Sequence, residues 1–150
     1  MFARFLKAGF VPTCTDLGLL LLRVGAGSTL FLRHGWEKVS TLTLINDHFP
    51  DPIGLGHSLT WSIALFNDGI FSLLIVLGIA TRWLSAFVII NISIAWALVH
   101  HFAFWDLPGK KLSGDHGELI VLYLWAFAAL VVTGSGRYSV EALLKDKPKA

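Results

Sequence analysis

Four long apolar segments, separated by polar stretches, dominate the hydrophobic pattern of the chain. They cover residues 16–33, 59–80, 83–104 and 117–133. Each holds roughly 17–22 residues, the length at which a helix rising 1.5 Å per residue crosses a hydrocarbon core ~30 Å thick. The runs are too long for strands and lack strict alternation. Because backbone groups in lipid must be paired within the segment, the pattern predicts four transmembrane helices.

The connections between these segments differ in length. Residues 80–82 leave only a tight turn between the second and third segments, which predicts an antiparallel hairpin. The connection over residues 34–58 is long and contains Phe49-Pro50-Asp51-Pro52. We therefore expect one all-α domain over residues 1–150, a four-helix membrane bundle with a short interfacial helix or loop after the first span.

Composition supports a bilayer as the solvent of the chain. Hydrophobic residues make up 55% of the 150 residues and charged residues 15%, against about a quarter charged in soluble domains. The net charge is only +2, and the basic residues flank apolar segments, which favours lipid headgroups over nucleic acid as a partner. Cys14 is the single cysteine, so thiol–disulfide relay chemistry within the chain is excluded.

The basic residues also predict an orientation. An even number of spans puts both termini on one side, which carries seven Lys and Arg residues against four on the other. Such a bias favours cytoplasmic termini. Trp36, Trp61 and Trp105 then fall at the outer interface and Trp83 at the inner one, as expected for aromatic belts.

Three ionisable residues, Arg23, Asp68 and Glu118, interrupt the apolar segments. Each costs about 2.5–3.5 kcal/mol at mid-membrane unless it is paired. Arg23 precedes His34 by eleven residues, or roughly 16 Å of helix, and Asp68 lies roughly 10–15 Å below its own end of the second segment. The similar depths predict a buried Arg23–Asp68 ion pair, which either fixes helix register or belongs to a site.

Helical periodicity groups the remaining polar residues. Eleven steps of about 100° return to nearly the same face, so Arg23 and His34 share one side of the first helix. The candidate buried polar site contains residues from all four spans: Arg23, His34, Asp68, His100 and Glu118. Two deep tryptophans, Trp96 and Trp125, are candidates to line a flat apolar pocket, although simple core packing is the favoured interpretation.

Histidines gather near the outer ends of the helices. His34, His100 and His116 are the weak candidates for metal or haem ligation, but no Glu-x-x-His or His-x-x-Glu-His spacing accompanies them. We therefore predict no metal site and interpret these histidines as interfacial groups that hydrogen-bond water and loops.

Several different short motifs are distributed along most of the chain. They are Arg23-x-Gly25, Phe31 and His34-Gly35-Trp36-x-Lys38; Phe49-Pro50-Asp51-Pro52-Ile53-Gly54-Leu55-Gly56; Leu77-Gly78-x-x-Thr81-Arg82; and Gly117-Glu118, Leu122-Tyr123 and Thr133-Gly134-x-Gly136-Arg137-Tyr138-Ser139. In this order and spacing they resemble the DoxX family of small membrane proteins. Asp68 stands where many relatives have Glu, and Ser135 where a proline is frequent, so an Arg23–Asp68 pair would be tighter than usual.

The resemblance implies a four-helix protein of a bacterial inner membrane, linked to quinone-related redox chemistry. On this basis the first hypothesis is a redox-associated subunit that binds quinone inside the bundle. Arg23 and His34 would donate hydrogen bonds to the quinone, and Asp68 or Glu118 would manage protons. Electrons would come from a redox partner protein or a bound cofactor, so the sequence does not decide whether the chain is itself an enzyme.

Two alternatives remain open. The chain could be a non-catalytic anchor that recruits a soluble oxidoreductase, or a small-solute or proton transporter. Four helices leave little room for a transport path, and no internal repeat is visible. A second copy of the chain is a further candidate partner.

Overall fold

Helices account for all regular structure in the computed structural model, which describes residues 14–40, 49–102 and 117–145. Three continuous helical stretches, Thr15–Ser40, His57–Leu77 and Thr81–Val99, are long and apolar enough to cross a membrane. A shorter apolar helix, Gly117–Thr133, occupies the fourth predicted span. The predicted all-α membrane bundle is therefore confirmed.

Each of the first three stretches contains a π-helical segment, labelled η. The first comprises α2 (Thr15–Leu30), η1 (Phe31–Gly35) and α3 (Trp36–Ser40). The second comprises α4 (His57–Leu65), η2 (Phe66–Phe71) and α5 (Ser72–Leu77). The third comprises α6 (Thr81–Ile94) and η3 (Ala95–Val99), and α7 (Gly117–Thr133) and α8 (Val140–Lys145) follow.

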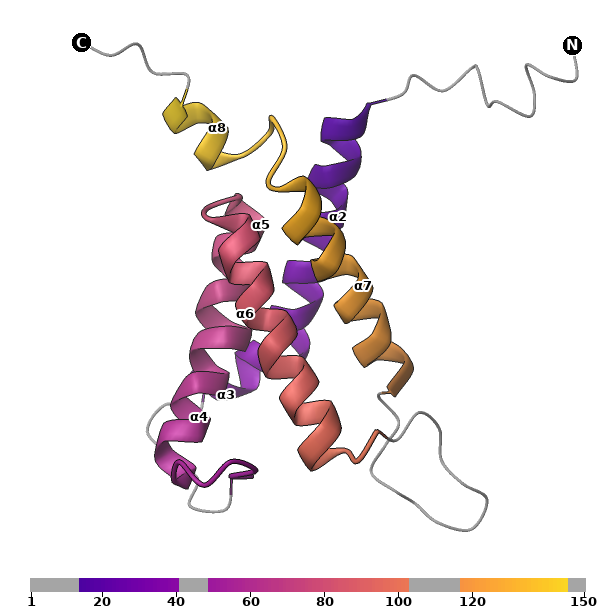
Figure 1. The fold of residues 1–150 in the computed structure, drawn as a ribbon. Coiled ribbons are helices and arrows are strands. Elements are labelled where there is room, and N and C mark those ends of the chain that lie inside the picture. The colour runs from indigo at the N-terminus through magenta and orange to yellow at the C-terminus, as the bar shows by residue number, and fades with distance from the viewer. Residues whose placement is uncertain (1–13, 41–48, 103–116, 146–150) are drawn as a thin grey trace, which may run out of the picture.

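The helices converge at one end of the bundle and spread at the other (Figure 1). The start of α2, the α5–α6 turn, the end of α7 and α8 all lie at the narrow end. At the α5–α6 turn, the amides of Gly78 and Ile79 donate to the carbonyls of Ile75 and Leu74. The backbone of Gly78 is in the left-handed helical conformation, with φ +74°. This is a Schellman cap, which ends α5 and lets α6 return antiparallel.

The first helix is longer than predicted. Residues 34–40 were expected to begin the connection after the first span, as part of a short interfacial helix or loop, but the first helix continues through η1 and α3 to Ser40. The third helix ends at Val99, earlier than the predicted residue 104. The first span was predicted to end at residue 33, whereas His34 and Lys38, beyond that position, line a cavity inside the bundle. The expected interfacial segment after Ser40 falls partly on residues outside the described ranges.

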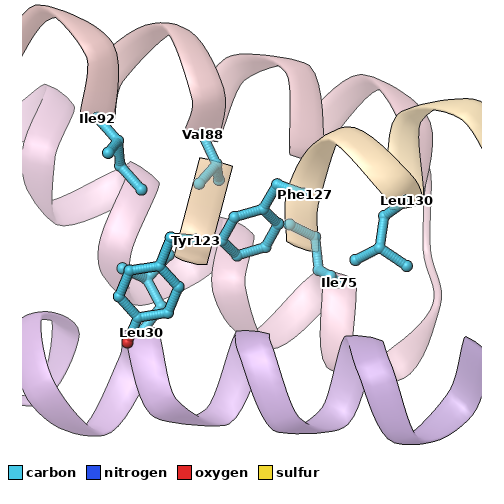
Figure 2. Close-up of a cluster of buried hydrophobic side chains, with 7 residues drawn as sticks. All are labelled: Leu30, Ile75, Val88, Ile92, Tyr123, Phe127 and Leu130. Atoms are coloured by element: carbon cyan, nitrogen blue, oxygen red, sulfur yellow. The ribbon is translucent and has the colours of Figure 1, made fainter. Parts of the chain in front are cut away.

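A cluster of buried apolar side chains holds the middle of the bundle together (Figure 2). It contains Leu30, Ile75, Val88, Ile92, Tyr123, Phe127 and Leu130. The Tyr123 and Phe127 rings are stacked with centroids 6.0 Å apart. Many large apolar residues point outward instead, which is the expected arrangement for helices solvated by hydrocarbon.

The tryptophan belt is only partly as predicted. Trp36, the first residue of α3, is 58% exposed, and Trp83, in the first turn of α6, is 75% exposed. Trp61 is 7% exposed and packs inside, so its assignment to the lipid interface was wrong. Trp105 lies outside the described residues.

Gly35 brings the first two helices into backbone contact at η1 and η2. A Cβ at Gly35 would overlap the carbonyl oxygen of Asp68 and lie 2.8 Å from its carbon. Gly25, on the same helix, has nothing within 4 Å of an added Cβ. Close approach is therefore required at Gly35 and not at Gly25.

We predict that Gly35→Ala lowers the free energy of unfolding by about 1–3 kcal/mol, because rigid backbone must move to accept the methyl group. Gly25→Ala, the matched control, should be neutral or stabilising by up to about 1 kcal/mol through helix propensity. Unfolding by SDS titration in mixed micelles measures both. Equal effects of the two substitutions would contradict the close η1–η2 contact.

Candidate functional site

A cavity of about 620 Å³ lies in the wider half of the bundle. Its walls come from η1 and α3, residues 49–53, α4 and η2, α6 and η3, and the first turns of α7. Most lining side chains are apolar, and the polar ones include His34, Lys38, Asn67, Asp68 and Tyr123. Cavities of this size and character hold small molecules in many proteins.

The π-helical segments surround this cavity. His34 lies in η1, Asp68 lies in η2, and η3 contributes Ala95 and Val99. A π-helical turn inserts an extra residue and changes the direction in which following side chains project, and such turns are frequent at functional sites. The three helices therefore depart from α-geometry where they form the cavity wall.

An ion pair between Lys38 and Asp68 forms the polar centre of the cavity. Lys38 Nζ lies 3.0 Å from Asp68 Oδ2, and the two side chains are 14% and 11% exposed. The ammonium group also donates to the His34 carbonyl at 3.0 Å. Asn67 Nδ2 donates to Asp68 Oδ1 at 2.9 Å. Both carboxylate oxygens are thus held, and the pair is neutral overall.

Tyr123 is a third polar group at the cavity. The residue is 6% exposed and belongs to the apolar cluster, with its hydroxyl oxygen at the edge of that cluster (Figure 2). The hydroxyl has no hydrogen-bond partner among the described residues. A buried hydroxyl without a partner costs free energy, so a ligand that accepts this hydrogen bond would remove the penalty.

The predicted Arg23–Asp68 pair is wrong. Arg23 donates to the carbonyl of Ser135 at 2.5 Å and to the carbonyl of Tyr138, while Asp68 pairs with Lys38. Arg23 and Lys38 are fifteen residues apart on one helix, so about 22 Å separates them along its axis. The error came from placing the membrane exit at His34, because the helix actually continues to Ser40.

Arg23 instead holds the C-terminal segment against the narrow end of the bundle. It is 2% exposed and occupies the space that a Cβ on Gly78 would need. Nearby, the amide of Arg137 donates to Asp16 at 2.9 Å, and the amide of Glu141 donates to the Gly78 carbonyl. These bonds tie the chain after α7 to α2 and α5.

Of the other predicted site residues, some line the cavity and some do not. His34 and His100 both line the cavity. Glu118 is exposed on α7 and does not line it. Trp125 is 73% exposed on the outer face, and Trp96 packs edge-on against Phe102 at 5.3 Å. Neither tryptophan lines this cavity.

The described parts of the chain contain no group of three or more His, Cys, Asp or Glu side chains placed to hold a metal ion. His34 and His100 are in this part, whereas His116 lies outside it. His34 and His100 each interact with neighbouring groups.

The family of the chain follows from comparison with known proteins. Residues 18–101 match the DoxX family, a segment that covers more than half of the 150 residues and holds the Lys38–Asp68 pair. The chain belongs to the DoxX family. It is also similar to a Haemophilus influenzae protein named only as uncharacterized, with 27% identity over 111 residues, 73% of this chain and 70% of that protein. No solved structure matches.

The DoxX match includes Arg23, His34, Lys38, Asp68 and His100 but ends before α7. The Tyr123 hydroxyl therefore comes to the cavity from outside the matched segment.

Sequence reasoning missed Lys38, Asn67 and Tyr123 as cavity residues of this DoxX protein. Lys38 follows His34 by four residues, a spacing that places both on one helix face and could have indicated it. Tyr123 lies four and seven residues before Phe127 and Leu130 on the buried face of α7, which indicates burial but not a cavity. Asn67 carries no comparable signal.

Asp51 organises a loop whose residues contribute to the cavity wall. Its carboxylate accepts hydrogen bonds from the amides of Leu55 and Gly56, at 2.9 and 2.7 Å, and from the hydroxyl of Thr60 at 3.0 Å. Desolvation raises the pKa of Asp51, but the hydrogen bonds from Gly56, Thr60 and Leu55 together outweigh it and hold this pKa below its ordinary value. The neighbouring prolines, 50 and 52, line the cavity.

A double-mutant cycle tests the ion-pair assignment. Lys38→Met and Asp68→Asn should each cost about 3–5 kcal/mol of unfolding free energy, since each leaves a buried charge alone. The double variant should cost less than the sum by at least about 1 kcal/mol. Arg23→Met with Asp68→Asn is the control, and its two effects should add within about 0.5 kcal/mol. Coupling of Arg23 with Asp68 would contradict the assignment.

The loop should respond to acid. Because the pKa of Asp51 is lowered in the folded protein, the carboxylate stabilises the loop above the ordinary pKa of about 3.9. That stabilisation is lost as the pH falls through the lowered value. The amide NMR signals of Leu55 and Gly56 should therefore shift with a midpoint below about 3.9. Asp51→Asn should abolish the transition, and a midpoint above 3.9 would contradict the capping role.

Proposed function

We propose that this DoxX protein is a redox-associated membrane subunit that binds a quinone, or a similar flat apolar molecule with polar oxygens, in its cavity. The observation that carries the proposal is the pairing of a largely apolar chamber with a polar centre inside a membrane bundle. Such a chamber suits a ligand that is soluble in lipid yet needs a few oriented hydrogen bonds.

The donors at the polar centre fit carbonyl oxygens. The Tyr123 hydroxyl is buried without a partner in the described chain. Lys38 has three N–H donors, and two acceptors are recorded for it, the His34 carbonyl and Asp68. A quinone oxygen would accept from Tyr123 or from Lys38, while Leu30 and Phe71 would contact the ring.

The roles that we propose for individual residues differ from those predicted from the sequence. Arg23 and Glu118 do not line the cavity, so we assign them no contact with the ligand. Asp68 remains the carboxylate beside it, and Lys38 pairs with it at 3.0 Å in a site where a lone charge would be costly. Electrons would be supplied by a partner protein or cofactor. We place the protein in a bacterial inner membrane with cytoplasmic termini, which the excess of basic residues on that side supports.

Tyr123→Phe separates binding from folding. Removing an unpartnered buried hydroxyl should leave the free energy of unfolding unchanged or raise it by about 1 kcal/mol. The same change should weaken quinone binding about tenfold, because one hydrogen bond is lost. The measurements are SDS unfolding of the ligand-free protein and equilibrium binding of a benzoquinone to protein in lipid nanodiscs.

The control for this substitution is Tyr138→Phe, since Tyr138 is 54% exposed in the segment between α7 and α8 and does not line the cavity. It should change neither quantity. If the unsubstituted protein binds no quinone, the proposal is wrong and the anchor hypothesis gains support.

A further inference from the structure

Stripes of exposed apolar side chains run along the outer faces of the second and third helical stretches. On α4, η2 and α5 the stripe follows a helical spacing of three and four residues: Leu59, Ile63, Phe66, Ile70, Leu73 and Leu77. On α6 it consists of Trp83, Phe87 and Ile90. This spacing marks one face of each helix, and in a membrane that face contacts hydrocarbon.

Four members of these stripes also line the cavity. They are Ile63, Phe66, Phe87 and Ile90, with exposures of 41–56%. Residues farther along the same stripe, such as Leu73 and Leu77, do not line it. The cavity wall and the lipid-facing surface therefore meet where α4 and η2 face α6.

The arrangement of the helices fits an opening at this place. α6 contacts η2 and α5, whereas α4 and the far half of α6 diverge toward the wide end (Figure 1). At that end, Phe49, Pro50, Pro52 and Ile53 contribute apolar wall. Phe66 at the rim and Asp68 at the polar centre are two residues apart on η2, so less than one helical turn separates them.

We infer that the cavity opens sideways into the bilayer between α4–η2 and α6, and that its ligand is a long-tailed amphiphile whose apolar tail lies in this opening. The inference rests on the proposed function and extends it to the chemical class of the ligand. The polar head would contact Lys38, Asp68 and Tyr123, and the tail would pass Ile63, Phe66 and Ile90 into hydrocarbon. A long tail in this position keeps its apolar surface out of water throughout.

Filling the opening tests the position of the tail. The variant Ile63→Trp with Ile90→Trp places two indoles at the rim, and Leu73→Trp adds one to the same lipid-facing stripe away from the cavity. Two probes are compared at equilibrium in phosphatidylcholine nanodiscs with full-length protein: a benzoquinone with a polyprenyl tail and the same benzoquinone without one.

The rim variant should bind the tailed quinone about tenfold more weakly and the tail-less quinone within about threefold of the unsubstituted protein. Leu73→Trp should bind both normally. If the rim variant binds both normally, the side opening is wrong and the proposed function stands. If it loses both while its circular dichroism is unchanged, the tail does not occupy the opening. If neither probe binds the unsubstituted protein, the proposed function itself fails.

A photoreactive tail gives a second readout that needs no substitution. A polyprenyl quinone with a diazirine on the tail should label peptides that contain Ile63 and Phe66 or Phe87 and Ile90, and excess tailed quinone should suppress the labelling. Labelling confined to other surfaces, or unaffected by competitor, would overturn the inference.

Discussion

The Lys38–Asp68 ion pair is the interaction on which the wide half of this bundle depends. In hydrocarbon, either charge alone costs about 2.5–3.5 kcal/mol. Lys38 and Asp68 therefore pair, and neighbouring groups hydrogen-bond to both members of the pair. The pair joins the first and second helical stretches at 3.0 Å, with Asn67 and the His34 carbonyl completing it. Gly35 makes the contact sterically feasible, because its missing Cβ leaves room for the η2 backbone.

A second polar tie closes the opposite end. Arg23 satisfies carbonyls of the chain after α7, and Arg82 donates to the Val132 carbonyl near the end of α7 at 3.0 Å. The Val132 carbonyl lies in the last turn of α7, where helix carbonyls have no partner within the helix, whereas the two carbonyls that Arg23 meets lie between α7 and α8. Between the two ties lies the apolar cluster around Phe127. The bundle is thus tightly joined where the helices converge and hollow where they spread.

The chain belongs to the DoxX family, and its cavity suggests how this fold would hold a ligand. The matched segment supplies the ion pair and both cavity histidines, whereas α7 adds Tyr123. Recognition of an oxygen-bearing head would therefore combine a charged pair on the first two helices with a neutral hydroxyl from the last. Lipid-facing side chains at the rim would contact the rest of the ligand.

The sequence alone determined the solvent, the helical class and the approximate spans, because an apolar run of about 20 residues satisfies its backbone in lipid only as a helix. It also indicated that His34, Asp68 and His100 face inward. Which charges meet was decided by tertiary structure. Arg23 and Lys38 are both cations on the first helix, and only the true length of that helix and the π-helical turns in it set their depths. Helix packing likewise decides that Trp125 and Glu118 are exposed and that Tyr123 lines the cavity. The pattern of one helix does not specify which neighbouring helix each of its faces contacts.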